Sequence, residues 1–133
     1  MEVQHQTARG FAVAFTPDTA YVGRMRRITK AHLRLWEVSG PAADGTLLAV
    51  SELVTNAIQH GHGSVGLKVL YAASHVRIEV SDGNPQPAQL TCANDEDTSG
   101  RGLFIVAVLA HKWGVSDDGK TTWCVIRLPA GRP

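Results

Sequence analysis

The stretch of sequence that decides the fold is Ser51-Glu52-Leu53-Val54-Thr55-Asn56-Ala57-Ile58-Gln59-His60-Gly61. At about 100° per residue, its apolar side chains and those just before it share one stripe of a helix. The stripe consists of Leu47, Val50, Val54, Ala57 and Ile58. His60 favours the negative end of the helix dipole and Gly61 favours a left-handed turn, so this pair marks the helix end. We therefore predict a helix from about Ala42 to His60, after a break at Gly40-Pro41.

A polar line lies on the opposite side of this predicted helix, formed by Glu52, Asn56 and His60. A carboxylate and a carboxamide four residues apart offer oxygen ligands, which magnesium bound to a nucleotide needs. Such residues are also ordinary on the solvated face of an amphipathic helix. This helix alone leaves both interpretations open, and signals elsewhere in the chain have to decide between them.

The composition is that of an ordinary small protein. The 133 residues carry a formal charge of +1 and 19% charged residues, so nucleic acid is not the expected partner. The length suits one domain over residues 1–133, with a core from about 11 to 129. The longest apolar run, Leu103 to Ala110, is far shorter than the roughly 20 residues of a membrane span, and no signal peptide is recognisable. We expect a cytoplasmic protein with no membrane partner, in which Cys92 and Cys124 are free thiols.

The N-terminal part predicts a strand followed by a helix. Phe11 to Phe15 alternates weakly, and Thr16-Pro17-Asp18 then supplies a cap with Pro at an early helical position. The helix, from about Asp18 to Trp36, has an apolar side and a basic side. The apolar side carries Val22, Met25, Thr29, Leu33 and Trp36, and the basic side carries Arg24, Arg26, Arg27, Lys30 and Arg34. Such a basic face is most often solvated, but it could meet an acidic partner.

The rest of the chain is rich in strands. Val65 to Tyr71 and His75 to Ser81 predict an antiparallel hairpin, which a long polar loop follows from Asp82 to Ser99. We expect a helix from Leu103 to His111, and then a hairpin that pairs residues 112–116 with 121–128. The predicted fold class is α/β, a two-layer sandwich of a mixed, mostly antiparallel sheet with its helices on one face.

Two further signals fit a nucleotide. Gly100-Arg101-Gly102 stands just before the helix at Leu103, where the backbone can approach a ligand and a helix start offers N–H groups to phosphate. Asp82 ends an apolar strand, and its carboxylate can accept a hydrogen bond from an exocyclic amine such as that of adenine. Each signal also has an ordinary explanation, because glycines serve turns and Asp before Gly83 initiates them.

In sequence order, and together with Gly119-Lys120-Thr121-Thr122-Trp123, these features resemble the ATP-binding domain of the GHKL superfamily, the histidine kinase-like ATPases with the Bergerat fold. Within it, the Ser-Glu-x-Val-Thr-Asn-Ala-Ile pattern ending in His-Gly is most similar to the anti-sigma-factor serine/threonine kinases of bacterial partner-switching systems. The resemblance covers the chain from Phe11 to Pro129. The ATP-binding residues that it implies are Asn56, Asp82, Gly83, Gly100, Arg101, Gly102, Leu103, Thr121 and Thr122.

The resemblance also implies a role for each part of the site. Asn56 would hold Mg²⁺, Glu52 would be the general base, and Asp82 would accept a hydrogen bond from the adenine amine, assisted by Thr121 or by Thr122. Residues 100–102 would close on the phosphates. A Glu four residues before the magnesium Asn suits a hydroxyl nucleophile, whose proton must be removed. Histidine autophosphorylation is therefore disfavoured.

The implied function is that of a kinase that uses ATP and Mg²⁺ to phosphorylate a serine on a STAS-type antagonist. Such kinases alternate between this antagonist and a sigma factor, often as homodimers. The sequence Asp82-Gly83-Asn84-Pro85-Gln86 departs from the usual Asp-x-Gly-x-Gly of the superfamily. This departure favours an alternative, a non-catalytic module that binds nucleotide and a protein partner. Plain ATP hydrolysis within a larger assembly is a third interpretation.

Overall fold

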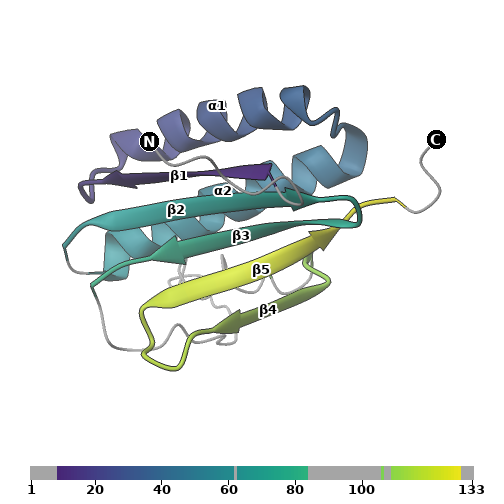
Figure 1. The fold of residues 1–133 in the computed structure, drawn as a ribbon. Helices are drawn as coiled ribbons and strands as arrows, with labels where there is room; N and C mark the ends of the chain where they lie inside the picture. Colours follow the sequence, from purple (N-terminus) through teal and green to yellow (C-terminus); the bar gives the residue numbers. More distant parts are fainter. Residues whose placement is uncertain (1–8, 62, 84–105, 107–108, 130–133) are drawn as a thin grey trace, which may run out of the picture.

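The computed structural model describes residues 9–61, 63–83, 106 and 109–129. These residues form one five-stranded sheet and two helices, and Figure 1 shows how they are arranged. The elements are β1 (Arg9–Phe15), α1 (Ala20–Leu35), α2 (Gly40–His60), β2 (Val65–Ala72), β3 (His75–Ser81), β4 (Lys112–Val115) and β5 (Thr121–Arg127). The strand order is β1-β2-β3-β5-β4, so β5 lies between β3 and β4.

Every strand pairing in the described residues is antiparallel. The predicted hairpin of β2 and β3 is confirmed, with Ala72 opposite His75 across a two-residue turn. The closing hairpin of β4 and β5 is confirmed as well. Its turn is held by Asp118, whose carboxylate accepts hydrogen bonds from the Ser116 hydroxyl at 2.6 Å and from the Lys120 N–H at 3.0 Å.

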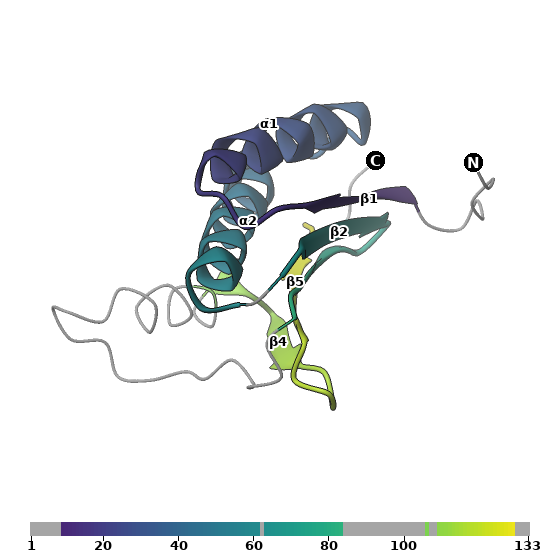
Figure 2. The same cartoon turned by 90° about the vertical axis from the view of Figure 1, so that its left-hand side faces the viewer.

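Both helices cover the same face of the sheet (Figure 2), which confirms the two-layer α/β prediction. The core lies between the layers, because alternate strand residues point toward the helices and are buried. These buried strand residues include Val65, Leu67, Val69, Val76, Ile78 and Val80. From α2, the core receives Val50, Val54 and Ala57 of the predicted stripe, together with Ala49 and Leu53. Leu47 and Ile58 are partly buried at its margin.

Cys124 belongs to this core rather than to any reactive site. It is a free cysteine, fully buried on β5 opposite Ile78. Burial raises the pKa of its thiol to about 12, so the group stays protonated at neutral pH. Cys92 lies outside the described residues.

The helix ends differ from the sequence prediction in three places. α1 begins at Ala20, and Asp18 stabilises its start by accepting a hydrogen bond from the Ala20 N–H at 2.9 Å, so Pro17 precedes the helix. Gly40 is the first residue of α2 rather than a break before it, and its φ of +67° suits glycine. Gly61 is extended, with φ −87° and ψ 178°, so the predicted left-handed turn is wrong.

Candidate functional site

The outer side of α2 presents the two residues singled out from the sequence. Glu52 and Asn56 are both half-buried, and they lie one helical turn apart. Residues at this spacing have Cβ atoms about 5–6 Å apart on one helix face. The structure therefore places a carboxylate beside a carboxamide at a partly shielded surface.

These two side chains fit a magnesium ion that arrives with its nucleotide. Within the ranges that the structure describes, no group of three or more His, Cys, Asp and Glu side chains is placed to hold a metal ion. Magnesium bound to a nucleotide takes few protein ligands, because phosphate oxygens and waters fill most of its octahedron. The Asn56 amide oxygen suits that limited role, with Glu52 one turn away.

A second cluster forms where α2 ends beside β3. Asp82 directly follows β3, and its N–H donates a hydrogen bond to the Lys120 carbonyl at 2.9 Å. A Cβ at Gly61 would lie 2.7 Å from Asp82 Cγ and 2.5 Å from the Ala57 carbonyl oxygen. Glycine is therefore required at position 61 by close approach, because a methyl group there would displace either the end of α2 at Ala57 or the carboxyl group of Asp82.

The two clusters define an elongated site along α2. Glu52 and Gly61 are nine residues apart, so at 1.5 Å per residue they are separated by roughly 13 Å along the helix. One end offers the carboxylate and carboxamide of Glu52 and Asn56, and the other offers the Asp82 carboxylate. A ligand that uses both ends must be long, with a group that magnesium binds at one end and a hydrogen-bond donor at the other.

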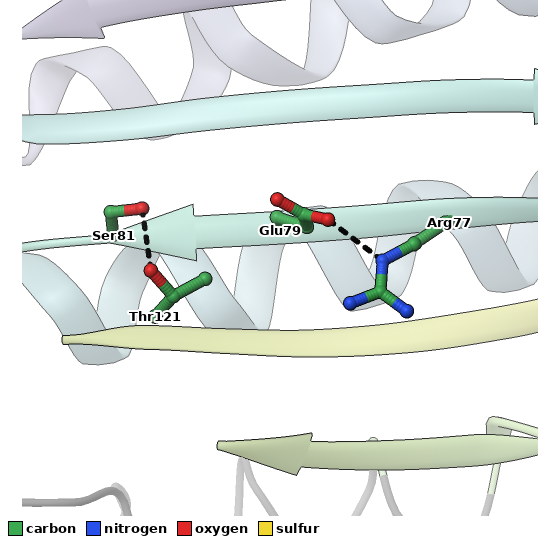
Figure 3. Close-up of polar contacts among 4 residues, drawn as sticks. All are labelled: Arg77, Glu79, Ser81 and Thr121. Atoms are coloured by element: carbon green, nitrogen blue, oxygen red, sulfur yellow. Dashed lines mark hydrogen bonds and ion pairs between the residues drawn. The ribbon is translucent and has the colours of Figure 1, made fainter. Parts of the chain in front are cut away.

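The strand register separates the two threonines that the sequence left as alternatives. Thr122 pairs with Val80, which is 3% exposed, so both side chains point to the helix-covered face. Asp82 lies two residues after Val80 and therefore on that same face. Thr121 pairs with Ser81, and their hydroxyl oxygens are 3.0 Å apart on the opposite face (Figure 3). Thr122 is therefore the threonine that the register places on the same face as Asp82.

Several predicted site residues cannot be placed. Gly83 is exposed directly after Asp82, whereas Gly100, Arg101, Gly102 and Leu103 lie outside the described residues. Most of the predicted helix from Leu103 to His111 lies there as well. Of that segment, Val106 is fully buried, and its carbonyl accepts a hydrogen bond from the Ala110 N–H at 2.8 Å, as in a helix.

The sequence did not predict the role of Ser51 or the contact between Gly61 and Asp82. Ser51 is 8% exposed and accepts a hydrogen bond from Arg26 of α1. A small polar residue next to Glu52, at a position that the helix buries, was the available signal. The contact between Gly61 and Asp82 had no sequence signal beyond the glycine itself, because the two residues belong to different elements.

Comparison with known proteins agrees with this geometry. The sequence model of one family, the histidine kinase-like ATPase domain, matches residues 15–126, from the last residue of β1 to the last residue but one of β5. No curated protein matches the chain in a sequence search. The fold and the family match define an ATP-binding domain of the GHKL type. The chain belongs to the histidine kinase-like ATPase domain family. None of its described helices is both long and apolar enough to cross a membrane.

Proposed function

We propose that this chain is a cytoplasmic serine/threonine protein kinase of the anti-sigma type, which uses ATP and Mg²⁺ to phosphorylate a serine on a STAS-type antagonist. Binding of that antagonist alternates with binding of a sigma factor, and the kinase acts as a homodimer. The observation that carries the proposal is the half-buried Glu52 one turn before Asn56, in a chain whose family binds ATP.

The proposed chemistry assigns one task to each end of the site. The serine hydroxyl oxygen attacks the γ-phosphorus, the bond to the β,γ-bridging oxygen breaks, and ADP leaves. Glu52 accepts the hydroxyl proton, while Asn56 contributes a ligand to Mg²⁺, which when bound neutralises charge on the phosphates. Asp82 accepts a hydrogen bond from the adenine amine, and Thr122 assists it from the same face. Residues 100–103 would contact the phosphates, as the family resemblance implies.

The test separates chemistry from nucleotide binding. Glu52→Gln should abolish transfer of ³²P from γ-labelled ATP to a STAS-type partner, because the amide cannot take a proton, and it should leave calorimetric Mg-ATP affinity nearly unchanged. Asn56→Ala should remove the magnesium dependence of ATP binding, and Asp82→Asn should weaken ATP binding itself. Parallel loss of binding and transfer in Glu52→Gln would refute the base assignment. ATP binding without phosphate incorporation into any partner would favour the non-catalytic module.

The docking surface for the partner is proposed on α1. Arg24, Arg27 and Arg34 are all exposed there, and α1 contains no acidic residue to neutralise them. A surface of one sign steers an oppositely charged partner, so an acidic surface of the antagonist or sigma factor would bind there. Charge reversal at these three arginines should lower partner capture, and unchanged capture at low salt would remove this surface from the proposal.

A further inference from the structure

One hydrogen bond ties the basic face of α1 to the helix that carries Glu52. Arg26 of α1 donates from Nη1 to the Ser51 hydroxyl at 2.7 Å, a distance typical of a strong charge-assisted bond. The Ser51 hydroxyl in turn donates to the Leu47 carbonyl at 3.0 Å, one turn earlier in α2. Ser51 is 8% exposed, and its hydroxyl both accepts and donates a hydrogen bond.

The contact of Arg26 with α2 differs from the contacts of its neighbours on α1. Arg24 lies over the Tyr21 ring, 5.2 Å from the centroid, within α1 itself. Lys30, one turn after Arg26, is exposed. Arg26, by contrast, makes its hydrogen bond across to α2, at the Ser51 hydroxyl. A purely solvated basic face does not need such a contact, which suggests a role beyond surface charge.

We propose that Arg26 is a positioning residue for Glu52, acting through Ser51. Ser51 and Glu52 are consecutive, so their side chains leave the helix about 100° apart and rotate together when α2 turns about its axis. The Arg26 guanidinium, hydrogen-bonded to the Ser51 hydroxyl, restrains that rotation. It thereby also restrains the direction in which the Glu52 carboxylate points. The inference rests on the proposed function, because it assumes that Glu52 removes a proton.

Restraint of this kind matters more for chemistry than for nucleotide binding. A general base must lie within hydrogen-bond reach of the proton that it removes, and small displacements of a reacting group cost large factors in rate. Asp82, at the adenine end, follows β3 and is not part of α2, so a rotation of the α2 turn that carries Ser51 leaves its backbone in place. Loss of the Arg26–Ser51 bond should therefore slow the chemical step at nearly constant ATP affinity.

The experiment measures single-turnover hydrolysis of Mg-ATP by the full chain, with water as the acceptor in place of a serine. Water attacks the γ-phosphorus, its proton passes to Glu52, and ADP and phosphate are released. Arg26→Ala and Ser51→Ala should each lower the rate about tenfold, with unchanged calorimetric affinity for Mg-ATP. The double variant should be no slower than either single variant, because both remove the same bond. Arg26→Lys, which can still donate to Ser51, should recover part of the rate.

Two controls distinguish positioning from general loosening. Lys30→Ala removes one positive charge from the same helix, one turn later, and should leave the hydrolysis rate unchanged. In a Glu52→Gln background, Arg26→Ala should cause no further loss, since Arg26 acts through Glu52. A merely structural role would instead add to the Glu52→Gln defect and weaken ATP binding in parallel.

The outcomes separate this inference from the proposed function. If Glu52→Gln slows hydrolysis and the Arg26 and Ser51 variants do not, the positioning role is wrong and the base assignment stands. If Glu52→Gln leaves hydrolysis unchanged, the base assignment fails and the inference fails with it. Additive effects of Arg26→Ala and Ser51→Ala would overturn the inference alone, as would an equal effect of Lys30→Ala.

Discussion

The two faces of the sheet differ most where β3 and β5 lie side by side. On the helix-covered face, Val80 and Thr122 are paired, and Asp82 continues from the same side toward the end of α2. On the open face, the hydroxyl groups of Ser81 and Thr121 form a hydrogen bond (Figure 3). Glu79 and Arg77 lie farther along β3 on the same face. Because side chains alternate along a strand, a single step in sequence separates the candidate site from the outer surface.

The largest effect that tests this difference is expected from a methyl group at Gly61. The new Cβ would lie 2.7 Å from Asp82 Cγ and 2.5 Å from the Ala57 oxygen, so Gly61→Ala must move either the helix end or Asp82. We expect a loss of about 1–3 kcal/mol in the free energy of unfolding, as for other overpacked sites, and at least about tenfold weaker ATP binding. Urea unfolding and calorimetry with Mg-ATP measure the two effects.

Gly114→Ala is the matched change on the open face. Its Cβ would lie 2.7 Å from the Trp123 ring, which is half-buried and can shift outward. Stability should fall here too, by a smaller amount, while ATP affinity stays unchanged. If both glycine variants weakened ATP binding equally, the assignment of the site to the helix-covered face would be wrong.

We expect smaller changes in ATP affinity and stability when either of the two threonines is replaced by valine. Thr122→Val keeps the side-chain shape and removes the hydroxyl from the Asp82 face, so ATP affinity should fall by about 1 kcal/mol, or roughly fivefold. Thr121→Val breaks the 3.0 Å bond to Ser81 and should lower the free energy of unfolding by about 1 kcal/mol without altering ATP affinity. The reverse pattern in calorimetry would show that Thr121 is the residue that assists Asp82.

Local sequence patterns predicted the elements well. The helix expected from Ala42 to His60 begins two residues earlier, at Gly40, and ends at the predicted residue, while β3 spans His75–Ser81 as expected. Val50 and Val54 are fully buried because a 3.6-residue period places them on the core side of α2. The exposure of Arg24 and Arg27 follows from the same period in α1. These properties depend on neighbours within one element, which a sequence shows directly.

The site depends on contacts between elements, and these were not predictable. Arg26 and Ser51 are 25 residues apart, and Ser81 and Thr121 are 40 apart. The choice between Thr121 and Thr122 required the register of β3 against β5, because a shift of one residue exchanges the two faces. A glycine at a helix end predicts a left-handed turn, whereas Gly61 is extended and is constrained by the nearby Ala57 carbonyl and Asp82 carboxyl groups.

We expect the smallest effect on the free energy of unfolding from substitutions of Arg77 and its two partners, Glu79 and Trp123, on the open face. Arg77 donates from Nε to Glu79 at 2.7 Å, and its guanidinium carbon lies 4.4 Å from the centroid of the Trp123 ring. The Arg77 and Glu79 side chains are 34% and 23% exposed, so solvent screens the pair. Double-mutant cycles in urea unfolding should give about 0.2–1 kcal/mol for Arg77 with Glu79 and about 0.5–1 kcal/mol for Arg77 with Trp123.

Salt distinguishes the two couplings. In 1 M NaCl the Debye length falls to about 3 Å, so the coupling of Arg77 with Glu79 should shrink, while contact with the Trp123 ring should retain more of its value. ATP affinity should stay constant in all of these variants, since none of the three side chains is on the Asp82 face. A change in ATP affinity at Arg77→Ala would mean that the strands transmit strain across the sheet, and the two faces would then have to be treated as one coupled unit.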